Sequence, residues 1–298
     1  MMEWRGVLGY TESCYEYEMK KFDQYCLEHF PDEDVLTWNI VLTYLTELRK
    51  SRDVRVDIAA IRNLGKFQVQ KGKSACVFPA GYFSHKKRKL PYIMSKEETR
   101  RFFKATDNYP RRDNNPLTEY TAPVIFRLQF SCGMRPQEVR LLKRQDFDFK
   151  NGTVYIADSK RHKDRCIAVD QRIMDMCGKY DGIARSMYPG TEFFFPNKDN
   201  EGISNESLTK MFHRCWSLAG NPENIEYCTP YILRHNYATQ TIMRWTEEGK
   251  DLGQYLPYLS VYMGHETFHS TLYYFHLIPE RIAKMDCMNM AEVIPEVE

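Results

Sequence analysis

Apolar residues recur at steps of three and four along most of the chain, a spacing that predicts a mainly helical protein. In the first third, this spacing predicts helices over residues 12–30, 34–50 and 54–70. Pro31 interrupts the pattern after the first helix, and Asp34 is placed to cap the second. The second helix carries the apolar stripe Val35, Trp38, Leu42, Leu45 and Leu48. We therefore predict a small helical domain over residues 1–80.

The helical spacing disappears between residues 71 and 93, where glycines, prolines and a basic run follow one another. We assign residues 81–94 to a basic linker between two domains. Ser95 and Glu98 then form the sequence pattern of a capping box, in which each side chain bonds the backbone N–H of the other residue. The second domain is therefore predicted to begin at residue 95 and to extend, with a C-terminal tail, over residues 95–298.

The second domain combines helices with a short stretch of strand spacing. A helix predicted near residues 117–132 is ended by Gly133, and another begins at Arg135 with a proline in its first turn. Two β-rich runs at residues 153–157 and 165–169 are joined by a polar hairpin loop. The predicted fold class is mainly α with a small antiparallel β-sheet. The other expected elements are helices near 171–187, 204–219 and 231–290, and a buried strand or turn at Phe193-Phe-Phe-Pro196.

A further helix start is predicted at Thr229-Pro230, where the threonine side chain would cap the first turn and the proline lacks an N–H. Arg234 and His235 fall in that first turn, where the N–H groups and the positive end of the helix dipole favour a phosphate. The apolar residues of this helix have the spacing of one buried face: Ile232, Leu233, Tyr237, Ala238, Ile242 and Trp245.

Charge is balanced over the 298 residues but unevenly distributed. Lys and Arg total 42 and Asp and Glu total 40, so the net charge of +2 does not by itself indicate a nucleic-acid binder. Residues 84–104, however, hold eight basic and two acidic residues, whereas residues 277–298 hold two basic and five acidic ones. This distribution is compatible with a polyanion bound near the basic segment, although a solvated linker explains the basic run equally well.

The other bulk features predict a soluble cytoplasmic protein. The nine cysteines show no CxxC pair and no regular spacing, which fits free thiols in a reducing compartment better than a disulfide framework. No apolar run approaches the roughly 20 residues that a membrane span needs, and the first residues show no secretory signal pattern.

The polar outliers of the second domain fall into four motifs. Taken together and in this order, they closely resemble the signatures of the tyrosine recombinases, the phage-integrase family of site-specific DNA strand-exchange enzymes. The resemblance covers about residues 95–290 and identifies the helical first domain as the core-binding (DNA-clamp) module of that family. The motifs are Gly133-Met-Arg135-Pro-Gln-Glu138-Val-Arg-Leu-Leu142, Ser159-Lys160-Arg-His-Lys163-Asp-Arg-Cys-Ile, Tyr231-Ile-Leu-Arg234-His-Asn-Tyr-Ala-Thr239, and Met263-Gly-His265 with Tyr274-Phe-His276.

The resemblance implies a role for each of several catalytic residues. Arg135 and Arg234 would hold the non-bridging oxygens of the scissile phosphate, with Glu138 keeping these arginines in place. Arginine suits this task because it stays charged and can engage two oxygens at once. Lys160, in the hairpin loop, would protonate the leaving 5′ oxygen. Lys163 is the competing lysine of that loop, and its alternative role is a contact with the DNA backbone.

The nucleophile in this resemblance is Tyr274, which would attack phosphorus and give a 3′-phosphotyrosyl link. The adjacent Tyr273 is the alternative, although the separation from His265 favours Tyr274. His265 would contact the phosphate or position the nucleophile. Tyr231 stands where the family usually has histidine, and a phenol is a weaker acid–base partner near pH 7, so the chemistry is expected to be slower. His235 and His276 are given no primary role.

The implied function is site-specific DNA strand breakage and rejoining by an integrase or recombinase of a mobile element. The tyrosyl ester conserves the bond energy, so rejoining needs no ATP, and the chain shows neither a Walker loop nor an acidic triad suited to Mg²⁺. No cofactor and no metal are therefore expected. The alternatives are a catalytically impaired DNA-binding protein of the same fold, a type IB topoisomerase, and a helical regulatory protein with coincidental motifs.

The expected partner is a double-stranded DNA recombination site. By family resemblance, a homotetramer would act on two duplexes, and the protein would associate with the nucleoid when bound to DNA. The C-terminal stripe Ile282, Met285 and Met288 would dock on a neighbouring protomer or on its own domain. The residues expected to contact the DNA backbone are Lys86, Lys87, Arg88, Lys89 and Lys163.

Overall fold

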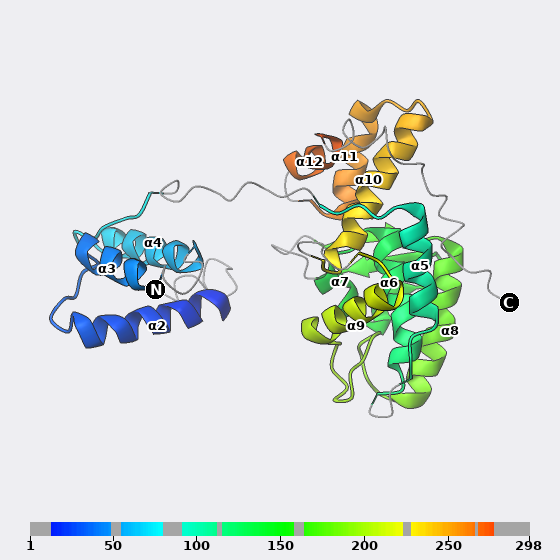
Figure 1. The fold of residues 1–298 in the computed structure, drawn as a ribbon, viewed down its shortest axis with the longest axis horizontal. Coiled ribbons are helices and arrows are strands. Elements are labelled where there is room, and N and C mark those ends of the chain that lie inside the picture. Colours follow the sequence, from blue (N-terminus) through cyan, green and yellow to red (C-terminus); the bar gives the residue numbers. More distant parts are fainter. Residues whose placement is uncertain are drawn as a thin grey trace. The chain divides into compact units, whose positions relative to one another are not determined.

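The computed structural model describes residues 13–48, 55–79, 91–111, 115–157, 164–222, 228–265 and 268–276. The chain divides into two compact units, Met1–Lys89 and Leu90–Glu298, which are described separately (Figure 1). The described part is mainly helical with a small three-stranded antiparallel sheet, which confirms the predicted fold class.

The first unit contains the helices α2 (Ser13–His29), α3 (Trp38–Leu48) and α4 (Arg55–Gln70), close to the ranges that the spacing predicts. Their apolar faces meet in one core, and burial of these side chains is the main stabilising contribution to the unit. The buried residues of this core are Phe22, Leu36, Ile40, Val41, Tyr44, Leu45, Ile58, Ile61, Cys76 and Phe78.

Helix α3 begins four residues later than predicted, at Trp38, and Asp34 does not cap it. The hydroxyl Oγ1 of Thr37 accepts from the N–H of Ile40 at 3.4 Å, and the carboxylate of Asp34 pairs with Nζ of Lys73 at 2.8 Å instead. The tertiary partner of Asp34 therefore overrides its local capping tendency.

The buried face of α3 also differs from the predicted stripe. Trp38 and Leu42 are 46% and 43% exposed, whereas Val41 and Tyr44 are buried. Apolar residues occupy more than one face of this helix, so spacing alone does not decide which face packs against α2 and α4.

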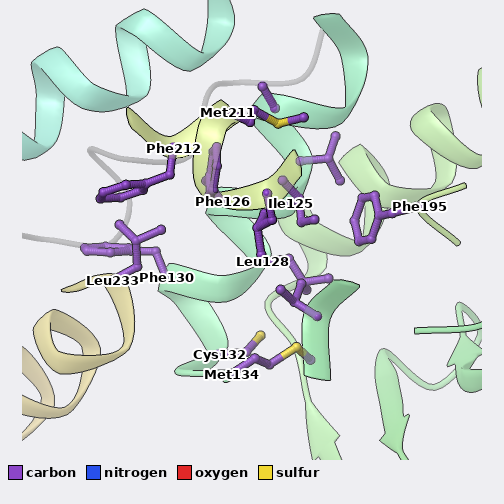
Figure 2. Packing of buried hydrophobic residues seen from close by; sticks show 14 of the residues in the cluster. Ile125, Phe126, Leu128, Phe130, Cys132, Met134, Phe195, Met211, Phe212 and Leu233 are labelled. Carbon is purple, nitrogen blue, oxygen red and sulfur yellow. The ribbon is translucent and has the colours of Figure 1, made fainter. Parts of the chain in front are cut away.

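The second unit is organised around α6 (Thr118–Cys132), which is buried along most of its length. The helices α5 (Lys96–Asp107), α8 (Gln171–Met187) and α9 (Asn205–Leu218) contact it or pack beside it. Figure 2 shows side chains of α6 packed against residues of α9 and the segment at Phe195. The rings of Phe102, Phe126 and Phe212 lie 5.3 to 5.9 Å apart between centroids, within the range of favourable aromatic pairs.

The local signals at both ends of the α5–α6 segment are confirmed. Ser95 and Glu98 form the predicted capping box, with Ser95 N donating to Glu98 Oε2 at 2.7 Å and Glu98 N donating to Ser95 Oγ at 3.2 Å. Gly133 ends α6 in the left-handed conformation, with φ 60°. Ile93 and Met94, at the end of the range assigned to the linker, are buried in the core of this unit.

The sheet has the order β1 (Phe147–Asp148), β2 (Thr153–Ile156) and β3 (Arg165–Ala168), all antiparallel. The predicted hairpin is β2–β3, in which Ile156 pairs with Arg165. Strand β1 is only two residues long, so the sequence showed no alternation that would predict it. In the segment Phe193-Phe-Phe-Pro196, Phe194 and Phe195 are fully buried, as expected, whereas Phe193 is only partly buried.

The last described helices are α10 (Tyr231–Glu247), α11 (Leu252–Met263) and α12 (His269–His276). Helix α10 starts at the predicted place, directly after Pro230, but it has no side-chain cap: the main-chain oxygen of Thr229 accepts the N–H of Ile232 at 2.9 Å. The three helices share a small core of Ala238, Ile242, Leu256, Leu259, Met263 and Tyr274.

Several predicted features lie outside the described residues: the basic run Lys86 to Lys89, the tip of the β2–β3 hairpin, and the C-terminal stripe beginning at Ile282. None of the described helices combines the length and the apolar character needed to cross a membrane. The cysteines at positions 26, 76, 132, 166, 177, 215 and 228 are free thiols.

Candidate active site

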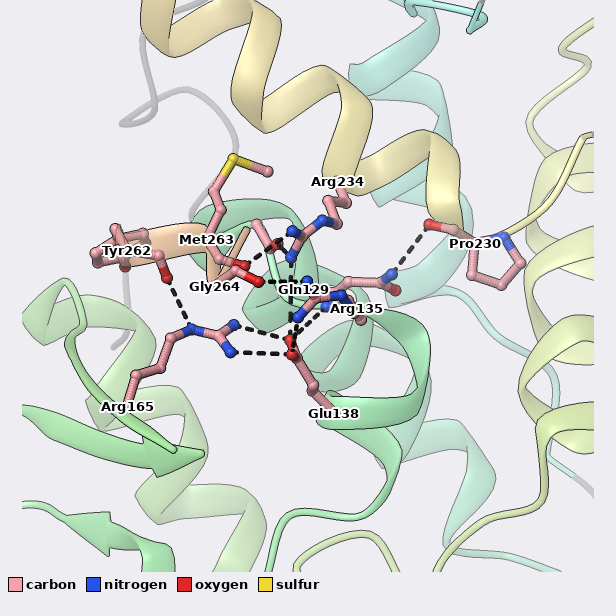
Figure 3. Close-up of polar contacts among 10 residues, drawn as sticks. Gln129, Arg135, Glu138, Arg165, Pro230, Arg234, Tyr262, Met263 and Gly264 are labelled. Atoms are coloured by element: carbon pink, nitrogen blue, oxygen red, sulfur yellow. Dashed lines mark hydrogen bonds and ion pairs between the residues drawn. The ribbon is translucent and has the colours of Figure 1, made fainter. Parts of the chain in front are cut away.

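Glu138 lies at the centre of the site, in the short helix α7 (Pro136–Arg140) that follows the end of α6. Its Oε2 accepts from the backbone N–H of Arg135 at 2.8 Å, and its Oε1 accepts from Nη1 of the same arginine at 2.5 Å (Figure 3). The carboxylate therefore both caps the start of α7 and holds the Arg135 side chain. Its side chain is 4% exposed.

Arg165, the first residue of β3, binds the same carboxylate from the other side. Its Nη1 and Nη2 donate to Glu138 Oε1 and Oε2 at 2.9 and 2.8 Å, a bidentate arrangement. Its Nε donates to the carbonyl oxygen of Tyr262 at 2.8 Å. The base of the β2–β3 hairpin is thereby tied to both α7 and α11.

Arg234 completes the group from the first turn of α10, where it is 3% exposed. Its Nη1 donates to the carbonyl of Gly133 at 2.7 Å, and its Nη2 donates to the carbonyl of Met263 at 2.8 Å. These carbonyls lie at the C-terminal ends of α6 and α11, where the helix dipole favours a cation. Nη1 also lies 4.0 Å from Oε2 of Glu138. We call Arg135, Arg165, Arg234 and Glu138 the arginine cluster.

Two glycines permit the backbone to approach side chains of the arginine cluster and its surroundings closely. Gly264 ends α11 with φ 63°, and a Cβ there would lie 2.6 Å from Nη1 of Arg165. The carbonyl of Gly264 accepts a hydrogen bond from Nη2 of Arg135. Gly133, with φ 60°, has a similar constraint, because a Cβ there would lie 2.3 Å from Cδ1 of Tyr237.

The charges of the arginine cluster make it a candidate site for an anion. Burial alone would raise the pKa of Glu138, but the hydrogen bonds and charges of Arg165 and Arg135 outweigh it and hold the pKa at about 2. Burial, with the charge of Arg135, lowers the pKa of Arg234 to about 10, so its guanidinium stays charged at pH 7. Three arginines against one carboxylate leave a formal excess of two positive charges. A buried excess of this kind favours a bound anion.

Tyr274 of α12 lies next to this cluster and is 5% exposed. Its hydroxyl is 2.9 Å from Nδ1 of His235, and its ring stacks on that of His265 with centroids 5.9 Å apart. Burial raises the pKa of Tyr274, and the charge and hydrogen bond of Arg234 act in the opposite direction. We call Tyr274, His235 and His265 the aromatic cluster.

Both imidazoles of the aromatic cluster are neutral at pH 7. Burial and the charge of Arg234 lower the pKa of His235 to about 4. Burial and the charges of the three arginines lower the pKa of His265 to about 3. Nδ1 of His265 lies 2.7 Å from Oγ1 of the buried Thr271, which fixes the orientation of the ring.

The structure thus brings together most of the residues that the sequence analysis assigned to catalysis: Arg135, Glu138, Arg234, His265 and Tyr274. Tyr231 lies at the edge, 44% exposed, with its ring centroid 6.2 Å from that of His235. Tyr273 packs edge to face against Tyr274 at 5.6 Å. Lys160 and Lys163 lie outside the described residues, as do the four basic residues from Lys86 to Lys89.

The sequence analysis gave no catalytic role to two members of the site: Arg165 was named only within a motif, and His235 was left without a primary role. The signal available for both was side-chain periodicity, which places them on buried faces but does not show what they contact there. Arg165 stands two positions before the buried Ile167 in a strand, so the two side chains share a face. His235 stands three and seven positions before Ala238 and Ile242, which are buried on one face of α10. Within the described ranges, no group of three or more His, Cys, Asp or Glu residues could hold a metal ion.

Residues 93–281 match the Phage integrase family. The chain therefore belongs to this family, the tyrosine recombinases. A putative integrase/recombinase, y4rE, of Sinorhizobium fredii (strain NBRC 101917 / NGR234) is 28% identical over 162 residues, which are 53% of this chain and 52% of that protein. The tyrosine recombinase XerC of Lactobacillus leichmannii is 28% identical over 195 residues, 64% of this chain and 60% of that protein. The chain thus spans little more than half the length of these relatives.

Among solved structures, the fold is similar to that of the XerH site-specific recombinase bound to a palindromic difH substrate in a post-cleavage complex. The TM-score is 0.65 with 18% identity, over 91% of this chain and 77% of that chain. This similarity confirms the fold.

Proposed function

We propose that this protein breaks and rejoins double-stranded DNA at specific sites through a 3′-phosphotyrosyl intermediate. The observation that carries the proposal is the arginine cluster, with its excess of two positive charges, beside the buried hydroxyl of Tyr274. Membership of the phage integrase family supports it. Relatives at this similarity are named integrase/recombinase and tyrosine recombinase.

The arginine cluster supplies what phosphoryl transfer demands. Negative charge on the phosphate oxygens grows in the transition state, and preorganised donors that already face the reacting group stabilise it without reorganisation. Arg135 and Arg234 would bind the non-bridging oxygens. Glu138, which accepts from Arg135 and Arg165, would hold the arginines at a fixed separation. Because the carboxylate neutralises only one of the three charges, the cluster still attracts phosphate.

The proposed covalent step exchanges one bond to phosphorus for another. The oxygen of Tyr274 forms a bond to phosphorus, and the bond from phosphorus to the 5′ oxygen breaks. Lys160 gives a proton to the leaving oxygen, and the phenol proton of Tyr274 is released to solvent, from which Lys160 is protonated again. The neutral imidazole of His265, fixed by Thr271, would donate its other ring N–H to the phosphate. Tyr231 would donate a hydrogen bond at the rim of the site.

No cofactor, ATP or metal ion takes part in this proposal, because the tyrosyl ester retains the energy of the broken bond. The first unit would act as the core-binding module, and the basic residues Lys86 to Lys89 and Lys163 would contact the phosphate backbone. Such contacts position DNA rather than select its sequence, and their binding weakens steeply with salt. We further propose four protomers on two duplexes, a mobile element as the source of the site, and a nucleoid-associated protein in the cytoplasm.

The test uses a nicked suicide duplex whose sequence is selected from a random pool by binding to the protein. Wild type should form a covalent adduct on a denaturing gel in the presence of EDTA, Tyr274→Phe should form none, and the matched control Tyr273→Phe should form it normally. Adduct from Tyr274→Phe overturns the nucleophile. Binding without adduct in wild type indicates an impaired DNA-binding protein, and relaxation of plasmids that lack any selected site indicates a topoisomerase.

The acid is tested with the same duplex. Lys160→Ala should cleave slowly and recover when the leaving 5′ oxygen is replaced by sulfur, since a thiolate leaves without a proton. Lys163→Ala is the matched control: it should bind DNA more weakly, but it should cleave at the wild-type rate when the protein saturates the duplex. Recovery by sulfur in Lys163→Ala, and not in Lys160→Ala, transfers the role to Lys163.

A further inference from the structure

The hydroxyl of Tyr274 has a partner in α10 that the proposed mechanism does not use. Nδ1 of His235 lies 2.9 Å from Oη of Tyr274, across 39 positions of sequence. The two rings are 5.7 Å apart between centroids. His235 directly follows Arg234, so one turn of α10 presents a guanidinium and an imidazole to the same hydroxyl.

The roles of donor and acceptor in this contact follow from the neighbours. The charge of Arg234 acts on the hydroxyl, and a guanidinium has donors only, so it favours the phenol oxygen as the acceptor on that side. The phenol proton then points away from Arg234, and Nδ1 of His235, 2.9 Å from the oxygen, is within hydrogen-bond distance to accept it. His235 is neutral at pH 7, because burial and the charge of Arg234 disfavour its protonated form. Its ring proton therefore resides on Nε2.

We infer that His235 is a positioning residue for the nucleophile: its Nδ1 accepts the phenol proton of Tyr274 in a hydrogen bond and so turns the oxygen lone pairs toward the arginine cluster. The inference rests on the proposed function, in which that oxygen attacks phosphorus bound by Arg135 and Arg234. Rotation about the C–O bond would otherwise let the proton face the phosphate, where it blocks attack. A hydrogen bond that holds the phenol in a geometry close to that of attack prevents this blocked orientation.

Orientation of the phenol explains the contact between His235 and Tyr274 better than proton transfer to His235 does. The pKa of His235 is lowered to about 4, and the pKa of Tyr274 is raised above its usual value of 10. The imidazole is therefore a poor base for this phenol, whereas a neutral Nδ1 is a good hydrogen-bond acceptor. The other imidazole of the site, His265, has its Nδ1 engaged by Thr271 and stacks on the face of the tyrosine ring.

Two polar substitutions separate orientation from simple packing. In His235→Asn, the amide oxygen occupies the place of Nδ1 and keeps the acceptor. In His235→Gln, the amide is displaced by one carbon, toward the place of Nε2, while size and polarity are retained. The control is His213→Asn, at an exposed histidine of α9. We expect single-turnover adduct formation to be within about threefold of wild type in His235→Asn and roughly 10- to 100-fold slower in His235→Gln, with unchanged DNA affinity.

A second readout needs no DNA. The ¹³Cζ resonance of Tyr274, assigned by its loss in Tyr274→Phe, should shift in His235→Gln and stay near its wild-type position in His235→Asn and His213→Asn. Cleavage at the wild-type rate in His235→Gln, or equal slowing of cleavage in His235→Asn and His235→Gln, overturns this inference and leaves the proposed function in place. If wild type itself forms no adduct, the proposed function fails and this inference fails with it, whereas the resonance still reports whether the hydrogen bond exists.

Discussion

The arginine cluster and the aromatic cluster are neighbours in one buried site, yet burial affects their charges in opposite ways. In the arginine cluster, Glu138 is ionised with a pKa of about 2 because Arg165 and Arg135 bond it directly. In the aromatic cluster, burial and the charge of Arg234 keep His235 and His265 neutral, and the charges of Arg135 and Arg165 add to the effect on His265. The difference arises because a buried charge persists only where an opposite charge and hydrogen bonds replace water.

This division suits a phosphoryl-transfer site. The charged half binds and stabilises the anion, while the neutral half surrounds the nucleophile with groups that can accept or donate hydrogen bonds without adding charge. Each half can be disturbed separately, so the comparison can be tested.

The largest effect is expected from removing the one negative charge of the arginine cluster. Glu138→Gln keeps the shape of the side chain but leaves Arg135, Arg165 and Arg234 to repel one another. We expect a loss of about 3–5 kcal/mol in the free energy of unfolding of the second unit, as for other broken buried ion pairs. Urea titration followed by hydrogen exchange of α6 and α10 measures this unit separately.

The control for Glu138 is Glu206→Gln, which breaks an exposed pair with Lys210. Exposed pairs contribute little, so the stability of this variant should be nearly unchanged. Equal losses in the two variants would mean that the buried carboxylate does not hold the arginine cluster together.

A somewhat smaller free-energy effect is expected at the transition state from Arg234→Ala. Removing one preorganised donor from a charge-stabilising site slows chemistry roughly 10²- to 10³-fold. The fold should persist, because the change also relieves the repulsion between Arg234 and Arg135. Single-turnover adduct formation measures the loss, and Arg214→Ala, on the exposed face of α9, is the control. Adduct formation at the wild-type rate in Arg234→Ala would exclude this residue from the phosphate site.

The neutral half predicts a dependence of stability on pH. His235 and His265 have folded pKa values of about 4 and 3, below the unfolded value of 6.5, so the unfolded chain binds more protons between these values. Their contribution is complete above pH 6.5 and is lost as pH falls through that window, by about 1 kcal/mol per histidine for each pH unit. Glu138 adds its own loss only below its unfolded pKa of 4.5, toward a folded pKa of about 2.

The interval between about pH 6.5 and 5 therefore isolates the histidines. Unfolding midpoints measured across it should fall in wild type and stay nearly level when both His235 and His265 are replaced by asparagine. The same slope in that double variant would place the titrating groups elsewhere and would remove the contrast between the two halves.

The parts of this fold that could be predicted from sequence depend on short-range chemistry. The capping box of Ser95 and Glu98 spans three positions, and the glycine end of α6 needs only one residue, so both were predicted correctly. The start of α3 was not, because Asp34 prefers Lys73, 39 positions away. Local patterns do not contain such a partner.

The candidate site divides in the same way. Arg135, Arg234, His265 and Tyr274 stand in motifs, and their resemblance to a family suggested them. Arg165 and His235 lie in the same motifs but become relevant only through contacts across 27 and 39 positions. Side-chain periodicity shows which face these residues occupy, whereas the partner on that face is set by tertiary packing.

The smallest effect we predict concerns how closely α11 approaches the charged half. Gly264→Ala adds strain at φ 63° and puts a Cβ 2.6 Å from Nη1 of Arg165, whose guanidinium cannot move without losing bonds to Glu138 and Tyr262. Gly220→Ala adds the same backbone strain at φ 59° but meets nothing within 4 Å. Left-handed strain costs about 1–2 kcal/mol in both.

We expect the free energy of unfolding of Gly264→Ala to be about 1 kcal/mol lower than that of Gly220→Ala, because only Gly264→Ala adds a clash. We also expect the Tyr274 ¹³Cζ resonance of Gly264→Ala to keep its wild-type position, because the added carbon disturbs the arginine cluster and leaves the His235 contact intact. A moved resonance would show that the two halves are mechanically coupled through Gly264 and do not respond separately.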